Sequence, residues 1–121
     1  MELNEYQERA MNTCMPTCDN FSYMALNLVA EVGEFMGKVA KAIRKNNIDI
    51  GDNRLWYNYP EPDEAFAHDA ELMYEAGDIL WQLSGLCAVM GWNLEDIAKM
   101  NLEKLASRKN RGVIAGDGDN R

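Results

Sequence analysis

Two pairs of acidic residues have the three-residue spacing that places both side chains on one face of a helix. Glu31 and Glu34 form the first pair, and Glu75 and Asp78 form the second. Each pair borders an apolar stripe of helical period, so the two pairs would meet if the stripes pack together. Two carboxylates about 4 Å apart repel by roughly 4 kcal/mol at an effective dielectric of about 20, which favours a bound cation.

The chemistry of these ligands indicates which cation and which partner the site would take. Oxygen-only ligands suit Mg²⁺ or Mn²⁺ rather than zinc, and Mg²⁺ completes its shell with waters and phosphate oxygens. The acids therefore predict a nucleotide ligand. Asn101, Lys104 and Arg108 share one face of a later helix, where the two cations would balance phosphate charge. The asparagine amide can hydrogen-bond a sugar or a base edge.

Long helices must position these side chains, and the apolar periodicity is helical almost throughout. The expected helices cover about residues 4–13, 19–45, 63–90 and 93–108. Asn4, Asp63 and Asn93 are the candidate N-caps. Residues 46–62 lack clear periodicity and predict a long connection, and no segment alternates as a strand does. The predicted fold class is all-α, an antiparallel bundle of two long helices with shorter N- and C-terminal helices.

Length, charge and cysteine content limit the classes of protein that fit. The 121 residues suffice for one domain, which we assign to residues 1–112, followed by a polar tail at 113–121. A net charge of −8 argues against polymeric nucleic acid as a partner. We find no leader and no apolar run of membrane-spanning length, so we expect a soluble cytoplasmic protein without a membrane partner. The three cysteines predict reduced structural thiols.

Each of these features alone has an ordinary structural explanation. An acid pair or a pair of basic residues on one helix face is usually solvated surface. The combination of two acid pairs beside apolar stripes with a cationic face is more specific. A di-iron bundle would need Glu-x-x-His pairs, and the single histidine, His68, precedes Glu71 in the reverse order. We therefore interpret His68 as a surface or helix-start residue.

The order E-x-x-E, E-x-x-D and N-L-E-K-L-x-x-R resembles the MazG-like all-α nucleoside triphosphate pyrophosphohydrolases. The segments LNLVAEVGEF, YEAGDILWQLSGL and NLEKLASRKNRG are each similar to blocks of that family. The resemblance covers about residues 20–45 and 70–112. Residues 46–62 match no family block, so the resemblance does not indicate which base or sugar is preferred.

The resemblance implies a Mg²⁺-dependent hydrolase, with Mn²⁺ as a possible substitute. It would cleave a ribo- or deoxyribonucleoside triphosphate to the monophosphate and pyrophosphate, and so control or clean the nucleotide pool. The implied metal ligands are Glu31, Glu34, Glu75 and Asp78. The implied substrate-binding residues are Asn101, Lys104 and Arg108.

Further site residues follow from their place beside the acids. Either Glu34 or Glu31 is the candidate to orient or deprotonate the attacking water. Lys38 and Asn27 lie on the same stripe and complete the set of substrate-binding candidates. Lys38 either reaches the phosphates or only offsets the acidic stripe.

Glycines inside the long helices indicate close helix packing. Gly33, Gly37 and Gly77 each cost about 1 kcal/mol relative to alanine at a helix interior. Close approach of helices, within a chain or between subunits, would explain them. Members of the resembled family work as dimers or tetramers, so we expect a homodimer or homotetramer.

Two questions remain open at the level of sequence. Trp56, Tyr57 and Tyr59 either stack on a base, anchor the connection or fill a subunit interface. The alternative function is a non-catalytic helical module that binds metal or nucleotide as a regulator. Retention of four mutually repelling carboxylates favours the enzyme.

Overall fold

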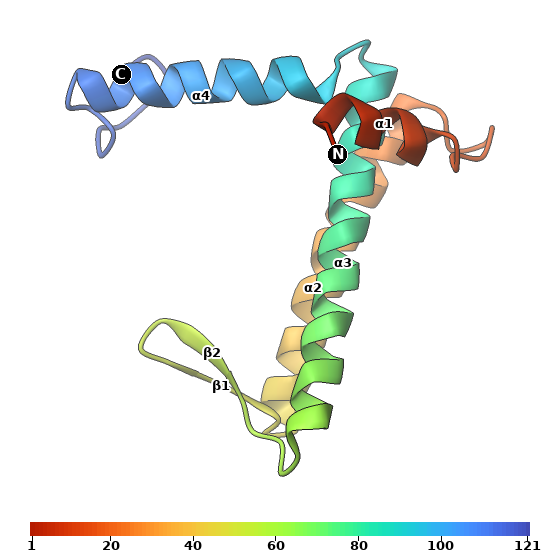
Figure 1. Ribbon diagram of the computed structural model, residues 1–121, viewed down its shortest axis with the longest axis vertical. Coiled ribbons are helices and arrows are strands. Elements are labelled where there is room, and N and C mark those ends of the chain that lie inside the picture. The colour runs from red at the N-terminus through yellow and green to blue at the C-terminus, as the bar shows by residue number, and fades with distance from the viewer.

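The computed structural model describes residues 1–121 and is predominantly helical (Figure 1). The elements are α1 (Leu3–Met11), α2 (Phe21–Arg44), β1 (Ile48–Gly51), β2 (Arg54–Tyr57), α3 (Pro62–Val89) and α4 (Leu94–Asn110). The all-α fold class is confirmed, and the helix ends lie within two residues of the expected ones. None of the helices is both long enough and apolar enough to cross a membrane.

Helices α2 and α3 pack against each other in antiparallel directions and form the long axis of the molecule (Figure 1). The short α1 packs across one end of this pair, mainly against α3 and also against α4. Gln7 of α1 fixes that end, because its amide nitrogen donates to the carbonyls of Ser84 and Trp92. Its amide oxygen accepts from the backbone N–H of Leu94 at 3.1 Å.

Only part of the expected bundle forms within one chain. The antiparallel pair is present, but α4 projects sideways from the end of α3 and leaves the long axis (Figure 1). The turn between them contains Gly91, whose φ of +74° lies in the left-handed region that glycine adopts without strain. The chain therefore changes direction here instead of returning along the helix pair.

Capping residues explain where the helices begin. Asn20 accepts a hydrogen bond from the Tyr23 N–H at the start of α2, and Asn93 caps α4 as expected. The other two expected caps are wrong. The N-cap of α3 is Glu61, before a proline in the first turn, and that of α1 is Glu2. Asn4 instead accepts from the Glu95 N–H at the start of α4.

A β-hairpin occupies residues 48–57, where the sequence predicted a connection without strands. Its two-residue turn consists of Asp52 and Asn53, which have φ values of 52° and 56°. Positive φ at both turn residues matches the twist of a tight hairpin. Ile48 pairs with Tyr57 across the strands and is buried, so this end of the hairpin packs on the helices. The expectation failed because the strands are only four residues long.

The buried core of one chain is small. Fifteen of the 121 residues are buried, and Met24 of α2 is fully buried. A Cβ at Gly85 of α3 would clash with the Met24 sulfur, so Gly85 leaves room for this side chain between the two helices. Gly33, Gly37 and Gly77 face open space, which excludes close packing within the chain as their explanation.

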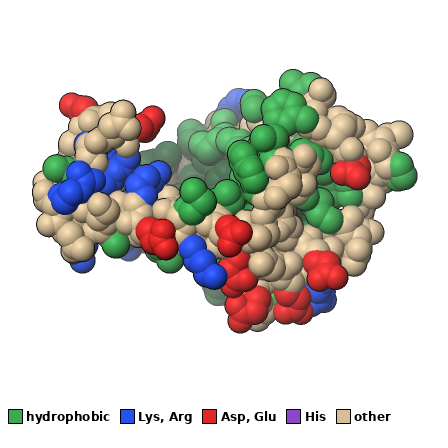
Figure 2. Space-filling model, turned by 90° about the horizontal axis from the view of Figure 1, so that it is seen from above, with side chains coloured by type: hydrophobic (Ala, Val, Ile, Leu, Met, Phe, Trp, Pro, Cys, Tyr) green, Lys and Arg blue, Asp and Glu red, His purple; other side chains and the backbone are tan.

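Large apolar side chains remain exposed along the helices. Leu26, Val29 and Tyr74 retain 75%, 74% and 77% of their accessible surface. Figure 2 shows hydrophobic side chains gathered over one side of the main body, beside the projecting α4. Contiguous apolar surface of this kind is typical of sites that contact another protein or a ligand.

Candidate metal centre

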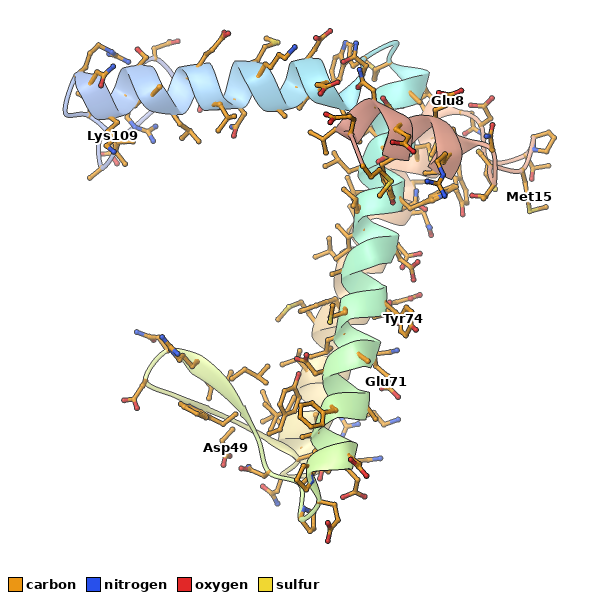
Figure 3. The ribbon with its side chains drawn as sticks, viewed as in Figure 1. Glu8, Met15, Asp49, Glu71, Tyr74 and Lys109 are labelled. Carbon is orange, nitrogen blue, oxygen red and sulfur yellow. The ribbon has the colours of Figure 1, made fainter.

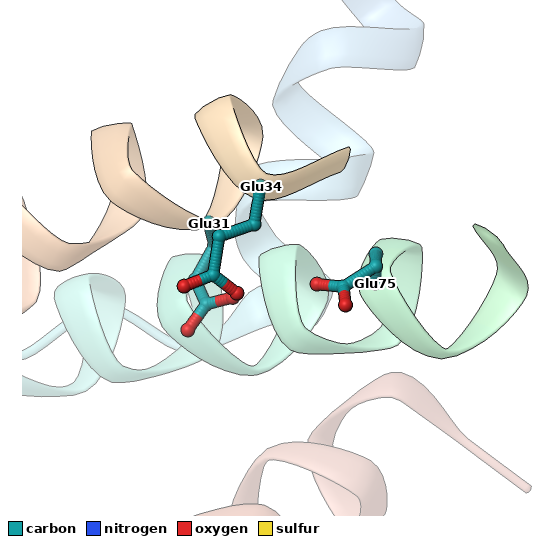
Figure 4. Close-up of side chains that lie close together, drawn as sticks. All are labelled: Glu31, Glu34 and Glu75. Carbon is teal, nitrogen blue, oxygen red and sulfur yellow. The ribbon is translucent and has the colours of Figure 1, made fainter. Parts of the chain in front are cut away.

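Three of the four expected metal ligands converge midway along the helix pair. Glu31 and Glu34 come from α2 and Glu75 comes from α3, and their side chains lie close together (Figure 4). One carboxylate oxygen from each residue lies within 4.8 Å of the others. The three-residue spacing on α2 and the antiparallel packing of α3 bring these acids to one place.

Two oxygens of this cluster are buried without any hydrogen-bond partner. Glu31 and Glu75 each use Oε1 in a polar contact, and each leaves Oε2 buried and unpaired. A buried carboxylate oxygen without a donor costs about 1–3 kcal/mol or more. Both orphaned atoms belong to the same cluster of oxygen donors, so a divalent cation such as Mg²⁺ or Mn²⁺ fits the residues present.

Burial and the neighbouring acids set the electrostatics of Glu31. Burial raises the pKa of the Glu31 carboxyl, and the charges of Glu34, Asp78 and Glu75 raise it further. The hydrogen bond from Asn27 works in the opposite direction and lowers that pKa. The raised pKa means that the surroundings disfavour the charged form of Glu31 until a cation compensates.

Asn27 holds Glu31 in place. Its side-chain nitrogen donates to Glu31 Oε1 at 3.2 Å and to Gln82 Oε1 at 2.7 Å. Gln82 is almost fully buried on α3, and its own nitrogen contacts the Met24 sulfur. Asn27 was expected to bind substrate, but in this structure it links α2 to α3 and orients a carboxylate. Gln82 was not among the expected site residues, although it lies on the acidic stripe of α3.

Lys38 supplies positive charge at one end of the cluster. Its Nζ atom lies 2.7 Å from Glu75 Oε1, and this hydrogen bond raises the pKa of the lysine. Lys38 is 41% exposed, so the ion pair contributes little to folding stability. Its main effect is to hold the ammonium group of Lys38 beside the carboxylates.

Asp78 lies beside the cluster without joining the group of three. Its charge reaches Glu31, whose pKa it raises, but its oxygens are outside the 4.8 Å group. Asp78 is exposed on α3, one turn beyond Glu75.

The expected cationic face lies away from the acids of the same chain. Asn101 and Lys104 are exposed on α4, which runs away from the α2/α3 pair. Figure 3 labels Lys109 near the far end of α4, remote from Glu71 on α3. Arg108 is buried, and its guanidinium donates to the carbonyl of Asp119 in the C-terminal tail. One chain therefore does not bring these three residues to its own carboxylates.

His68 lies in a polar and aromatic cluster at the hairpin end of α3. It is buried, so its interpretation as a surface residue is wrong, although it does lie near the start of the helix. The Tyr59 hydroxyl and His68 Nδ1 are 3.0 Å apart, and the Tyr57 ring lies against the imidazole. Burial and a hydrogen bond to Asp69 raise the pKa of Tyr57 to about 12. Tyr57 and Tyr59 thus anchor the hairpin to α3.

Fold and site together define the class: an all-α protein with a carboxylate cluster between two antiparallel helices. The model of the MazG nucleotide pyrophosphohydrolase domain matches residues 20–113. The chain therefore belongs to the MazG nucleotide pyrophosphohydrolase family. It is also 34% identical to the Gene 37 protein of Mycobacterium phage L5, over the full length of both chains. No solved structure matches it.

Proposed function

We propose that this protein is a Mg²⁺-dependent nucleoside triphosphate pyrophosphohydrolase. It would hydrolyse ribo- or deoxyribonucleoside triphosphates to the monophosphate and pyrophosphate, and so control or clean the nucleotide pool. The observation that carries the proposal is the pair of buried, unpaired oxygens of Glu31 and Glu75 within one carboxylate cluster. Family membership supports the same reaction class, hydrolysis of a phosphoric anhydride bond.

Different carboxylates of the cluster suit different tasks. Glu31 and Glu75 each have one buried, unpaired oxygen and would hold Mg²⁺, with Asp78 as an additional ligand. When bound, the cation would neutralise phosphate charge and polarise the anhydride. Glu34 is exposed and makes no hydrogen bond, so its carboxylate can accept a proton from a water at the open side of the site. Glu34 is therefore our preferred general base, ahead of Glu31.

Residues around the cluster would position the substrate. Asn27 keeps Glu31 oriented through a hydrogen bond, while Lys38 lies at the surface and can donate to a phosphate oxygen. Asn101 and Lys104 would reach the substrate only from the α4 of a neighbouring subunit. Arg108 would first have to leave its contact with the C-terminal tail.

Assembly into a homodimer or homotetramer is part of the proposal. The small core and the exposed Leu26 and Val29 support it, because burial of these side chains between subunits would be favourable. The open space around Gly33, Gly37 and Gly77 also leaves room for a helix of another subunit.

The test is Mg²⁺-dependent release of pyrophosphate from a panel of ribo- and deoxyribonucleoside triphosphates. We expect turnover with Mg²⁺, loss of turnover with EDTA, and recovery when excess Mg²⁺ is restored. Absence of turnover with every nucleotide, in Mg²⁺ and in Mn²⁺, would overturn the proposal and leave the non-catalytic binding module.

A further inference from the structure

A recess next to the carboxylate cluster is lined by three lysines. It has a volume of about 420 Å³ and lies between the C-terminal part of α2 and the N-terminal part of α3. We propose that this recess binds the pyrophosphate end of the nucleotide, the β- and γ-phosphates that leave together as pyrophosphate. This inference rests on the proposed function, because it names the part of the same substrate that the recess accepts.

The lysines of the recess follow one face of α2. Lys38, Lys41 and Lys45 are spaced at i, i+3 and i+7, so their ammonium groups point to the same side of the helix. Glu64 and Glu71 of α3 also line the recess, and their carboxylates would repel an anion. Lys38 is paired with Glu75, so the three lysines face three carboxylates and the recess is close to neutral, in a chain whose overall charge is −8. Lys41 and Lys45 make no ion pair, which leaves their ammonium groups available to an anion.

Neutral polar side chains in the wall of the recess add hydrogen-bonding groups to its lysines. His68 lies in the recess wall, and its Nδ1 atom is engaged by the Tyr59 hydroxyl at 3.0 Å. Nε2 of the same ring makes no hydrogen bond. It can donate to a phosphate oxygen in one tautomer, or accept from a protonated phosphate oxygen in the other. The side-chain amide of Asn47 also lines the recess and offers an N–H donor.

Lys38 makes the recess continuous with the carboxylate cluster. The same side chain lines the recess and contacts Glu75 Oε1 at 2.7 Å. A triphosphate with its α-phosphate beside the carboxylates would therefore extend its other two phosphates toward Lys41 and Lys45. The bond that is cleaved would lie at the boundary between the two regions.

The size and lining favour phosphates over the nucleobase as the occupant. A volume of about 420 Å³ falls within the range of roughly 300–1,000 Å³ that is typical of small-molecule sites. Only three of the ten lining residues are hydrophobic, namely Ala42, Ala67 and Tyr59, and the Tyr59 ring packs edge-on against His68. A base needs a broad apolar or aromatic surface to stack on, and the recess offers little of it.

The experiment measures pyrophosphate binding directly, by isothermal titration calorimetry with Mg²⁺ at fixed ionic strength. It compares the wild type with the double variant Lys41→Gln/Lys45→Gln. Two charge-assisted hydrogen bonds are lost, so we expect pyrophosphate to bind at least roughly tenfold more weakly. Arg44→Gln is the matched control, because Arg44 lies in the same turn of α2 and does not line the recess. Circular dichroism confirms that each variant is folded.

The outcomes separate this inference from the proposed function. If the wild type hydrolyses nucleotides but the double variant binds pyrophosphate as tightly as the wild type, the recess proposal is wrong. The proposed pyrophosphohydrolase function would be unaffected. An equal loss of affinity in Arg44→Gln would show only a general charge effect and would also overturn the recess. Selective loss in the double variant, with a matching rise in KM for the triphosphate, supports the recess. Failure of the wild type to hydrolyse any nucleotide overturns the proposed function itself.

Discussion

At the scale of single residues, the carboxylate cluster combines two acids that each have one buried oxygen with a third acid that is exposed. Glu31 and Glu75 each satisfy one oxygen with a neighbour, Asn27 or Lys38, and leave the other unpaired. Glu34 makes no hydrogen bond and is exposed to water. This division predicts that Glu31 and Glu75 control metal affinity and stability, while Glu34 mainly controls the rate of hydrolysis.

Glu34→Gln should abolish turnover while the fold survives. The glutamine cannot accept a proton from water, and removal of a general base typically costs about 10²–10⁴ in rate. Glu34 makes no hydrogen bond, so the thermal midpoint should change little. Asp78→Asn should also abolish turnover, because it removes a carboxylate that we propose as an additional metal ligand. Full activity in either variant with metal binding unchanged would contradict these roles, and Asp63→Asn is the control neutralisation on α3.

The raised pKa of Glu31 predicts how stability depends on pH when no metal is present. The folded protein binds this proton more readily than the unfolded chain, so protonation stabilises the fold. Stability should fall as pH rises from the ordinary glutamate pKa to the raised one. Thermal melting in EDTA across this interval measures the effect.

Glu31→Gln should remove that pH dependence. It also relieves charge repulsion, so at neutral pH in EDTA we expect a gain of about 1 kcal/mol, or roughly 3–6 °C in Tm. Addition of Mg²⁺ should raise the Tm of the wild type by a similar amount, and it should leave the Tm of Glu31→Gln unchanged. A lower Tm for Glu31→Gln in EDTA would show that the cluster carries no uncompensated charge.

At the scale of elements, the sequence predicted the helices well because their signals are local. Apolar periodicity located α2 and α3, and the i, i+3 spacing of Glu31 and Glu34 is readable without a structure. The β-hairpin was missed, although Ile48 and Ile50 alternate before the Asp-Asn turn and Leu55 and Tyr57 alternate after it. Strands of four residues, in which Ile48 is buried but Ile50 is exposed, give too little periodicity to separate from a loop.

The direction of α4 could not be predicted from sequence. Its N-cap and length are local properties, but the side on which it leaves α3 depends on the left-handed turn at Gly91 and the contacts of Gln7. Asn101 and Lys104 were therefore correctly placed on one helix face, without any indication that this helix leaves the acids of its own chain. Long-range packing decides that question.

Gly85→Ala should destabilise the contact between α2 and α3. The added Cβ would meet the side chain of Met24, which is fully buried and cannot move into solvent. Overpacking of this kind typically costs about 1–3 kcal/mol, measured here as a fall in thermal midpoint.

The double variant Gly85→Ala/Met24→Ala tests the cause of that loss. If the clash is real, the double variant should lose less stability than the sum of the two single variants. Additive losses would show that Gly85 is not required for close helix packing.

At the scale of the whole molecule, one chain lacks a sufficient core. Only eight hydrophobic residues are buried, while Leu26, Val29 and Tyr74 are largely exposed on the long helices. The sequence indicated an oligomer through its interior glycines, but the extent of the exposed apolar surface became visible only in the fold. The interior glycines and the exposed apolar surface both support subunit association. Helix α4 projects from the helix pair, so it could contact a neighbouring subunit (Figure 1).

Light scattering at micromolar concentration should therefore give the mass of a dimer or tetramer. The double variant Leu26→Glu/Val29→Glu should dissociate it, because burial of unpaired carboxylates at a subunit contact is strongly unfavourable. Turnover should fall with dissociation if a neighbouring α4 contributes Lys104. Val29→Ile keeps the surface apolar and should retain the wild-type mass. A monomeric wild type would contradict the assembly.

The pyrophosphohydrolase assignment is tested most directly by identifying the products after incubation with a single deoxyribonucleoside triphosphate and Mg²⁺. Chromatography would separate mono- and diphosphate, and wild type would be compared with Glu34→Gln. We predict monophosphate and pyrophosphate in equal amounts from the wild type and neither from Glu34→Gln. Diphosphate with inorganic phosphate, or equal product from both proteins, would contradict the assignment of the Glu31, Glu34 and Glu75 cluster as the centre of a pyrophosphohydrolase.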